Sequence, residues 1–175
     1  MIHSPLLQSR HAFLDSNDDP TWSGRGRYSD NMLPDISIRH WRKGSQWFEM
    51  QRSLAAYVVS DEKYHGLFEK HCNGSCYPDE HFLPTFVNMF RGSETSNRTV
   101  TWADWSSASG RGRKHPNKYG AGNTTEGLVR SLRRNQTTSC AYNDGVASTC
   151  HLFARKFDAS ALEALLGLAS RVMEF

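Results

Sequence analysis

The sequence predicts an α/β fold with a mixed sheet, flanking helices and long ordered loops. Apolar residues recur at helical spacing in several segments, and two short segments have the alternation or the apolar run of strands. Turn-forming residues are frequent in residues 11–46, which leaves little room there for long elements. A chain of 175 residues is long enough to bury a hydrophobic core.

The predicted helices follow from this spacing. Residues 53–70 should form one helix or two short ones, and another helix should begin at Pro78, because proline suits the first helical turn. A short basic helix should end near Arg134. The last helix, residues 160–173, is expected to place five residues inward: Leu162, Leu165, Leu166, Ala169 and Val172.

Two strands are predicted. Residues 98–105 alternate, with Val100 and Trp102 on one face, and residues 150–154 read as a buried strand. The stretch between them, residues 106–122, is rich in Ser, Gly and basic residues and is expected to be an exposed loop.

Charge and hydropathy exclude some classes of protein. There are 21 Lys and Arg against 18 Asp and Glu, so a net charge of +3 does not by itself indicate a nucleic-acid binder. Hydrophobic residues make up 38%, which argues against disorder. No run of about 18 apolar residues occurs, so no membrane-spanning helix is expected.

The first residues lack the charged and apolar regions of a secretory signal, so the protein is either cytosolic or lacks its natural start. Sequons favour the second interpretation, since each is a possible glycan acceptor in the secretory pathway. They lie at Asn73, Asn97, Asn123 and Asn135.

Four cysteines allow three pairings. In an oxidising compartment the nearest-neighbour pairing is expected, Cys72 with Cys76 and Cys140 with Cys150. A zinc site is the alternative for Cys72, Cys76 and two nearby histidines, but their spacing matches none of the common structural patterns. Disulfides or free thiols are therefore favoured, and no metal is expected.

Several charged residues have both a functional and an ordinary interpretation. Gly-interleaved Arg25 and Arg27 could contact nucleic-acid phosphates, bind an anionic or sugar ligand, or form solvated turns. Glu80, at a helix start, is a candidate acid/base residue or an ordinary helix N-terminal acid. Arg155 and Lys156 could hold a diphosphate or be solvated at a strand end.

Combined, short strings are more specific than these single features. In order along the chain they are Phe13-x-x-Ser-x-Asp-Asp-Pro, Gly24-Arg-Gly-Arg-Tyr28, Trp41-Arg-Lys-Gly-Ser-Gln-Trp-Phe-Glu49, Cys76-Tyr-Pro-Asp-Glu-His81, Asn97-Arg-Thr-Val-Thr-Trp-Ala-Asp-Trp105 and Cys150-His-Leu-Phe-Ala-Arg-Lys-Phe157. With them the chain resembles the plant branch of the core-2/I-branching β-1,6-N-acetylglucosaminyltransferase family, from about residue 10 to the C-terminus.

The resemblance implies an inverting glycosyltransferase with a GT-A-like domain, which moves a sugar, N-acetylglucosamine by family, from a UDP-sugar to a hydroxyl of a glycan acceptor. It implies no cofactor, because characterised animal members use basic residues in place of a divalent metal. Family members are Golgi membrane proteins with a lumenal catalytic domain.

The resemblance also implies roles for single residues. Glu80 corresponds to the catalytic base and Lys156 to a residue that contacts the donor diphosphate. Acceptor binding falls on Trp102, Arg25 and Arg27. A second diphosphate-binding arginine corresponds to Arg134 or Arg133.

By this resemblance, residues 1–175 are the C-terminal, acceptor-binding part of a catalytic domain, without the anchor and the nucleotide-binding half. Little or no catalysis is then expected from the chain alone. The alternatives are a catalytically inactive glycan- or anion-binding fragment and, third, a nucleic-acid-binding protein, although nucleic acid is not an expected partner of this family.

Overall fold

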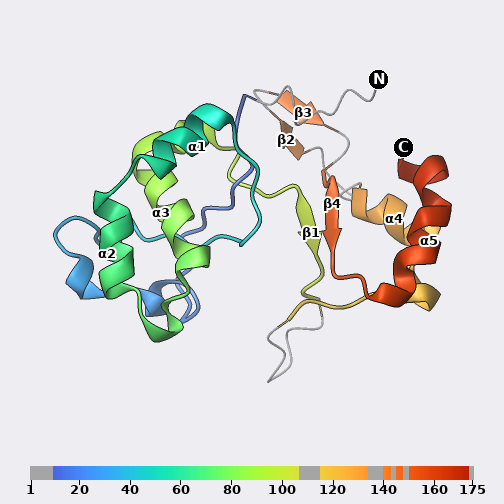
Figure 1. Cartoon of the computed structure of the whole chain (residues 1–175), viewed down its shortest axis with the longest axis horizontal. Coiled ribbons are helices and arrows are strands. Elements are labelled where there is room, and N and C mark those ends of the chain that lie inside the picture. The colour runs from blue at the N-terminus through green and yellow to red at the C-terminus, as the bar shows by residue number, and fades with distance from the viewer. Residues whose placement is uncertain (1–9, 107–114, 134–139, 143–144, 148–149, 174–175) are drawn as a thin grey trace. The chain divides into compact units, whose positions relative to one another are not determined.

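The structure, a computed structural model, describes residues 10–106, 115–133, 140–142, 145–147 and 150–173. They divide into two compact units, the first ending at Thr99 and the second beginning at Val100 (Figure 1). Helices and short strands occur together in the chain, which confirms the predicted α/β class. Within the described residues, no helix is long and apolar enough to cross a membrane.

Three helices build the first unit, and residues 53–70 form two of them rather than one. The helices are α1 (Arg52–Val59), α2 (Lys63–His71) and α3 (Pro78–Arg91). Between the first two, the carboxylate of Asp61 accepts hydrogen bonds from the backbone N–H groups of Tyr64 at 3.2 Å and His65 at 2.7 Å. The backbone N–H groups in the first turn of a helix have no partner within the helix, and these bonds satisfy two of them. They therefore favour the start of a new helix directly after Asp61.

The long stretch before α1 is an ordered loop, as predicted. Backbone bridges pair Phe13 with Glu49 and Asn17 with Lys43, both antiparallel. Both bridges are reciprocal, with N–O distances of 2.7 and 3.1 Å in the first and 2.8 and 2.9 Å in the second. Short 3-10 turns complete the unit: η2 (Arg25–Arg27), η3 (Asp30–Met32), η4 (Gly74–Cys76) and η5 (Gly92–Glu94).

Trp41 anchors this loop in the core beside α3. Its side chain is 1% exposed, and its ring stacks on His81 with centroids 4.6 Å apart and on Phe68 at 5.4 Å. The indole N–H donates to the carbonyl oxygen of Gly24 at 3.1 Å. A buried indole needs such a partner, and this one fixes the chain that leads into η2.

Gly44 lies where the loop passes closest to α3. A Cβ at this position would overlap the carbonyl oxygen of Asp15 and would lie 2.6 Å from Cγ of Pro84. The Gly44 N–H donates to the carbonyl oxygen of Glu80 at 2.8 Å. The absence of a side chain therefore lets the loop bond directly to the first turn of α3.

The second unit contains two small sheets, one parallel and one antiparallel. β1 (Thr101–Ala103) pairs with β4 (Phe153–Arg155) in parallel, with Trp102 opposite Ala154. β2 (Cys140–Tyr142) pairs with β3 (Gly145–Ala147) in antiparallel fashion. A disulfide joins Cys140 to Cys150, and another in the first unit joins Cys72 to Cys76, so the cysteines pair with their nearest neighbours.

The strand predicted at residues 150–154 is displaced, and its predicted burial is partly wrong. Cys150 is 1% exposed, but its N–H bonds to the carbonyl oxygen of Arg133 rather than to a strand, and pairing begins only at Phe153. Phe153 is 49% exposed. The strand predicted at residues 98–105 is confirmed only as its centre, β1.

Helices α4 (Glu126–Arg133) and α5 (Leu162–Leu168), with the π-helical turn η8 (Ala169–Met173), pack through Val129, Leu168 and Val172. The predicted inward positions of α5 are partly wrong, since Leu162 and Leu166 are 56% and 60% exposed. Leucines occur all round this helix, so apolar spacing alone does not determine which face packs. The short turns η6 (Ala121–Asn123) and η7 (Ala159–Ala161) complete the unit.

Candidate active site

Glu80, the predicted catalytic carboxylate, lies in the first turn of α3, the helix start at which it was expected. Tyr77 has a left-handed backbone with φ of 52°, and Pro78 follows as the first helical residue. The carbonyl oxygen of Tyr77 accepts from the Glu80 N–H at 3.0 Å. An acidic side chain interacts favourably with the positive end of the helix dipole, and that of Glu80 is 26% exposed. The carboxylate is therefore fixed in place and still reachable from solvent.

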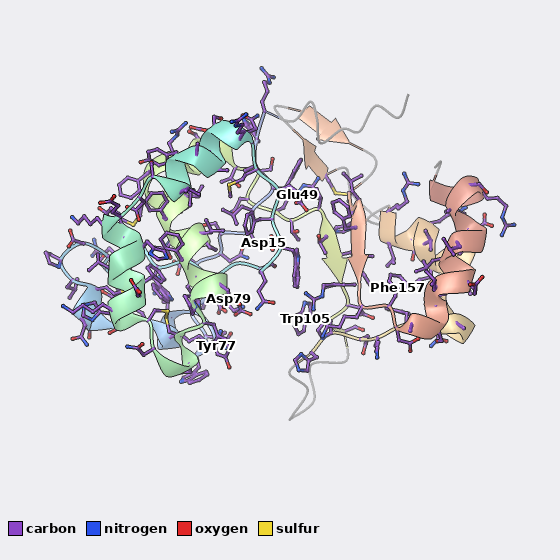
Figure 2. All side chains as sticks on the ribbon, in the orientation of Figure 1. Asp15, Glu49, Tyr77, Asp79, Trp105 and Phe157 are labelled. Atoms are coloured by element: carbon purple, nitrogen blue, oxygen red, sulfur yellow. A yellow bond between two sulfur atoms is a disulfide. The ribbon has the colours of Figure 1, made fainter. Side chains whose placement is uncertain are left out.

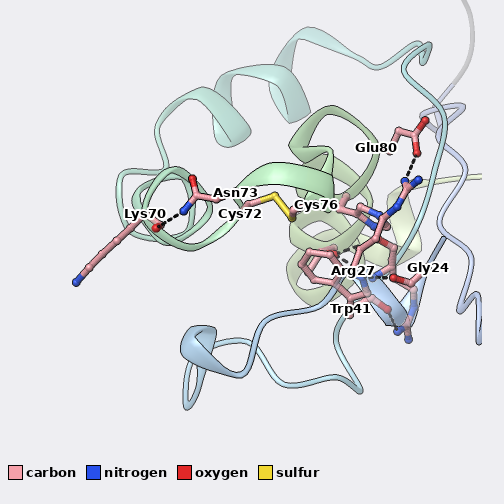
Figure 3. The surroundings of a disulfide bond; sticks show 11 residues. Gly24, Arg27, Trp41, Lys70, Cys72, Asn73, Cys76 and Glu80 are labelled. Atoms are coloured by element: carbon pink, nitrogen blue, oxygen red, sulfur yellow. Dashed lines mark hydrogen bonds and ion pairs between the residues drawn. A yellow bond between two sulfur atoms is a disulfide. The ribbon is translucent and has the colours of Figure 1, made fainter. Parts of the chain in front are cut away.

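Two cations hold one oxygen of this carboxylate. Nη1 of Arg27 donates to Oε2 of Glu80 at 2.9 Å, the contact drawn in Figure 3, and Nζ of Lys43 lies 3.3 Å from the same oxygen. The Arg27 side chain is 13% exposed, and its guanidinium lies 4.3 Å from the ring centroid of Tyr77. No described residue donates a hydrogen bond to the other oxygen, Oε1. Oε2 is thus anchored, and Oε1 is free to accept a proton or a hydrogen bond.

Arg25, the other predicted acceptor-binding arginine of η2, is directed to a different partner. Its Nε and Nη2 donate to the two carboxylate oxygens of Asp18 at 2.8 and 2.7 Å. Hydrogen bonding and the charge of Arg25 lower the pKa of Asp18. Of the two arginines, the structure brings only Arg27 to Glu80.

His81, the residue after Glu80, has a packing role. The side chain is fully buried against Trp41, and Nδ1 donates to the carbonyl oxygen of Arg42 at 2.8 Å. Burial lowers the pKa of His81 and favours the neutral ring. Cys72 and Cys76, the cysteines of the zinc alternative, form a disulfide with each other, so neither has a free thiol to offer a metal.

The second unit holds Lys156, directly after β4. Its carbonyl oxygen accepts from the N–H of Tyr119 at 2.9 Å, and its N–H donates to the carbonyl oxygen of Asn117 at 3.4 Å. Among the residues that the structure describes, none forms an ion pair with the Lys156 ammonium group. The backbone is therefore held while the charge stays available for a ligand.

Trp102 belongs to an aromatic cluster in the same unit. Its ring centroid lies 6.0 Å from that of Tyr119, which lies 5.9 Å from that of Phe157, labelled in Figure 2. The Tyr119 hydroxyl donates to Oδ2 of Asp104 at 2.5 Å, and Asn117 donates to the same oxygen at 2.8 Å. The cluster places Trp102 one ring away from the segment that holds Lys156.

The bonds to Asp104 shift two pKa values in opposite directions. Hydrogen bonds, that of Asn117 foremost, lower the pKa of Asp104. Burial, followed by the hydrogen bond to Asp104, raises the pKa of Tyr119 to about 12. Both shifts favour the bonded pair of an ionised carboxylate and a neutral phenol.

The candidate second diphosphate arginine is engaged elsewhere or not described. Nη1 of Arg133 donates to the carbonyl oxygen of Val172 in η8 at 2.5 Å, so its guanidinium ties α4 to the C-terminal turn. Arg134 lies outside the described residues. The diphosphate role of either residue stays a prediction.

The described sequon asparagines are all exposed. Asn73 and Asn123 lie in short turns, whereas Oδ1 of Asn97 accepts a hydrogen bond from the backbone N–H of Ser16 at 2.9 Å. Asn135 lies outside the described residues.

Residue-type reasoning missed Lys43 and Tyr77 as neighbours of the site. Both lie in the quoted strings, Lys43 in Trp41–Glu49 and Tyr77 in Cys76–His81. The joint occurrence of these two strings with Gly24–Tyr28, which carries Arg27, was therefore the sequence signal that could have identified both neighbours.

The comparisons with known proteins agree with these strings. The family model described as Core-2/I-Branching enzyme matches residues 2–133, so the chain belongs to that family. It is 32% identical over 200 residues to the rice protein (Oryza sativa subsp. japonica) named Glycosyltransferase BC10, an alignment that covers 94% of this chain. The chain spans about half of that relative's length, 49%. No solved structure matches.

Proposed function

We propose that this protein is an inverting glycosyltransferase that moves a sugar, N-acetylglucosamine in the first instance, from a UDP-sugar to a hydroxyl of a glycan acceptor. Membership of the Core-2/I-branching family supports the reaction class. The observation that carries the assignment of the base is the first turn of α3, where Arg27 and Lys43 fix Oε2 of Glu80 and Oε1 stays open.

In the proposed step, Glu80 takes the proton of the acceptor hydroxyl while the oxygen of that hydroxyl bonds to the anomeric carbon of the donor. The bond from that carbon to the diphosphate oxygen breaks, and its electron pair leaves with the diphosphate. Attack from the side opposite the leaving group inverts the anomeric configuration. A general base positioned in this way contributes about 10²- to 10⁴-fold in rate.

Lys156 is the proposed partner of the negative charge that develops on the diphosphate. Its ammonium group has no ion pair among the described residues, and its backbone is fixed by Tyr119 and Asn117. A positioned cation of this kind stabilises the leaving group electrostatically. Trp102 is proposed to offer its ring to a sugar of the acceptor.

The proposed location is the Golgi lumen. Two disulfides support an oxidising compartment, and the exposed sequons Asn73 and Asn123 are accessible to the glycosylation machinery. Mass spectrometry of protein purified from plant cells, before and after enzymatic deglycosylation, tests entry into the secretory pathway, which this location requires.

The reaction itself is tested by product analysis. The full-length protein is incubated with UDP-N-acetylglucosamine, whose sugar is α-linked, and a mixture of glycan acceptors. NMR should find a new β-linked sugar, formed equally well with and without a chelator. An α-linked product would overturn the inverting mechanism, and a strict requirement for a divalent metal would overturn the role of Lys156.

A further inference from the structure

A second feature of the first unit, a pocket of about 620 Å³, is not used by the proposed reaction. It lies between α2 and the start of α3, and Gln46 and Phe48 from the preceding loop contribute to it. Its volume is within the range of small-molecule binding pockets, about 300 to 1,000 Å³. The pocket thus has room for a ligand larger than a single ion or water molecule.

The pocket wall is aromatic and partly open to solvent. Phe48 is 37% exposed, and Phe82 and Leu83 of α3 contribute further apolar surface. The face of an aromatic ring is electron-rich and attracts the slightly positive C–H groups that cover one face of a pyranose. An exposed phenylalanine in a pocket therefore suits a sugar ring as well as a purely apolar ligand.

The rim supplies hydrogen-bonding groups of both kinds. The side-chain amide of Gln46 donates to Oδ2 of Asp79, and no described residue donates to Oδ1 of Asp79. Gln46 keeps its carbonyl oxygen as an acceptor and its second N–H as a donor. A hydroxyl, which is both donor and acceptor, matches this pair of side chains.

The charge of the lining excludes the nucleotide donor. Asp79 and Glu69 line the pocket, and none of its described lining residues is Lys or Arg. Two carboxylates repel a diphosphate, which needs cations or clustered N–H groups. The combination of an aromatic wall, a hydroxyl-binding rim and acidic charge points to a neutral, polyhydroxylated ligand.

Asp79 places the pocket beside the proposed base. Asp79 and Glu80 are consecutive residues in the first turn of α3, so their side chains leave the helix about 100° apart. Glu80 is directed to Arg27, whereas Asp79 is directed to Gln46 at the pocket rim. The proposed base and the pocket rim are therefore reached from different faces of the same helix turn.

We propose that this pocket is a second saccharide subsite, which holds a neutral sugar unit of the acceptor next to the unit that reacts at Glu80. The inference rests on the proposed function for the identity of the reacting unit. Binding to the pocket itself needs neither the donor nor the base. The subsite would select acceptors of at least two sugars over single sugars.

The test is to measure saccharide binding to this chain by NMR, with no donor present. The neutral probes are lactose, cellobiose, xylobiose and a neutral glycan array, and the charged controls are UDP and glucosamine. At least one neutral oligosaccharide should bind saturably. Phe48→Ala and Gln46→Ala should each weaken that binding about tenfold, the size expected for the loss of one good contact.

Matched controls separate the pocket from general damage. Phe153→Ala removes a phenylalanine of similar exposure from the second unit, and Gln51→Ala removes an exposed glutamine outside the pocket. Both controls should bind the oligosaccharide within twofold of wild type. Chemical-shift changes should fall on residues of the pocket wall.

The outcomes distinguish this inference from the proposed function. Glu80→Gln should lower the transfer rate at least about 100-fold and leave pocket binding within about threefold. Transfer that survives in Glu80→Gln would overturn the proposed base and leave the pocket intact. The subsite is overturned if no neutral oligosaccharide binds, if only UDP or glucosamine binds, or if the variants Phe48→Ala and Gln46→Ala bind as well as wild type.

Discussion

Nη1 of Arg27 lies 2.9 Å from Oε2 of Glu80, although 53 positions separate the two residues in the chain. The contact joins the 3-10 turn η2 to the first turn of α3, and both partners are largely shielded from solvent. Because a charge-assisted hydrogen bond strengthens as water is excluded, this pair fixes the orientation of the carboxylate more firmly than a surface ion pair would.

Replacing Arg27 should impair transfer far more than replacing Arg25. Arg27→Ala removes a hydrogen bond between charged groups, and we expect kcat/KM for the acceptor to fall about 10- to 100-fold. Arg25→Ala breaks an exposed ion pair with Asp18 and should change kcat/KM less than about threefold. Steady-state kinetics of the two variants tests this, and equal losses would contradict the placement of Arg27 at the site.

Lys43 should contribute less to transfer than Arg27 does, and it should act through its charge alone. Its ammonium lies 3.3 Å from Oε2 of Glu80, and its side chain is 26% exposed. We expect Lys43→Met to lower kcat/KM about three- to tenfold and Lys43→Arg to retain most of it. The same assay measures both variants. A loss in Lys43→Met that exceeds that of Arg27→Ala would show that the assignment of the main anchor is wrong.

Two glycine substitutions should change the free energy of unfolding with opposite signs. Gly44→Ala places a Cβ against Asp15 and Pro84 and should destabilise the protein by about 1 to 3 kcal/mol. Gly66→Ala adds a Cβ with no neighbour within 4 Å inside α2, and should stabilise it by about 0.5 to 1 kcal/mol. Urea denaturation measures both. Stabilisation by Gly44→Ala would contradict the close approach of loop and helix.

The pair of Asp104 and Tyr119 should make stability depend on pH at both ends. The pKa of Asp104 is lowered by folding, so its stabilisation is present above its ordinary pKa of 3.8 and is lost as the pH falls. The pKa of Tyr119 is raised to about 12, so its stabilisation is present below its ordinary value of 10.0 and is lost as the pH rises through 12.

Asp104→Asn should therefore flatten the acid side of the stability curve, and Tyr119→Phe should flatten the alkaline side. Urea denaturation of wild type and both variants at pH 3, 7 and 11 gives the comparison. If the wild-type and Asp104→Asn curves run parallel between pH 7 and pH 3, the carboxylate is not bonded as described.

The sequence predicted elements best where local chemistry determines them. Pro78 begins a helix because its ring fits the first turn, and Asp61 caps α2 and divides the helical stretch. The cysteines of each pair lie only four and ten positions apart, and the nearest-neighbour pairing expected from the sequence is the one found. The family strings predicted membership, because their order along the chain is specific.

Other features depend on contacts between distant residues, which spacing does not contain. Leu168 of α5 packs against Val129 of α4, whereas Leu162 and Leu166 of the same helix are exposed. Arg25 and Arg27 look equivalent in the sequence, and only the fold, which brings Asp18 to one and Glu80 to the other, distinguishes their partners. The pocket beside Asp79 has no sequence signature at all.

The central claim is that Glu80 is the general base, and the transfer rate of Glu80→Gln in the full-length protein tests it most directly. The matched control is Glu62→Gln, an exposed carboxylate between α1 and α2. With unfolding curves shown to be equal, the rate should fall at least about 100-fold in Glu80→Gln and stay near wild type in Glu62→Gln. Near-normal transfer by folded Glu80→Gln would contradict the account.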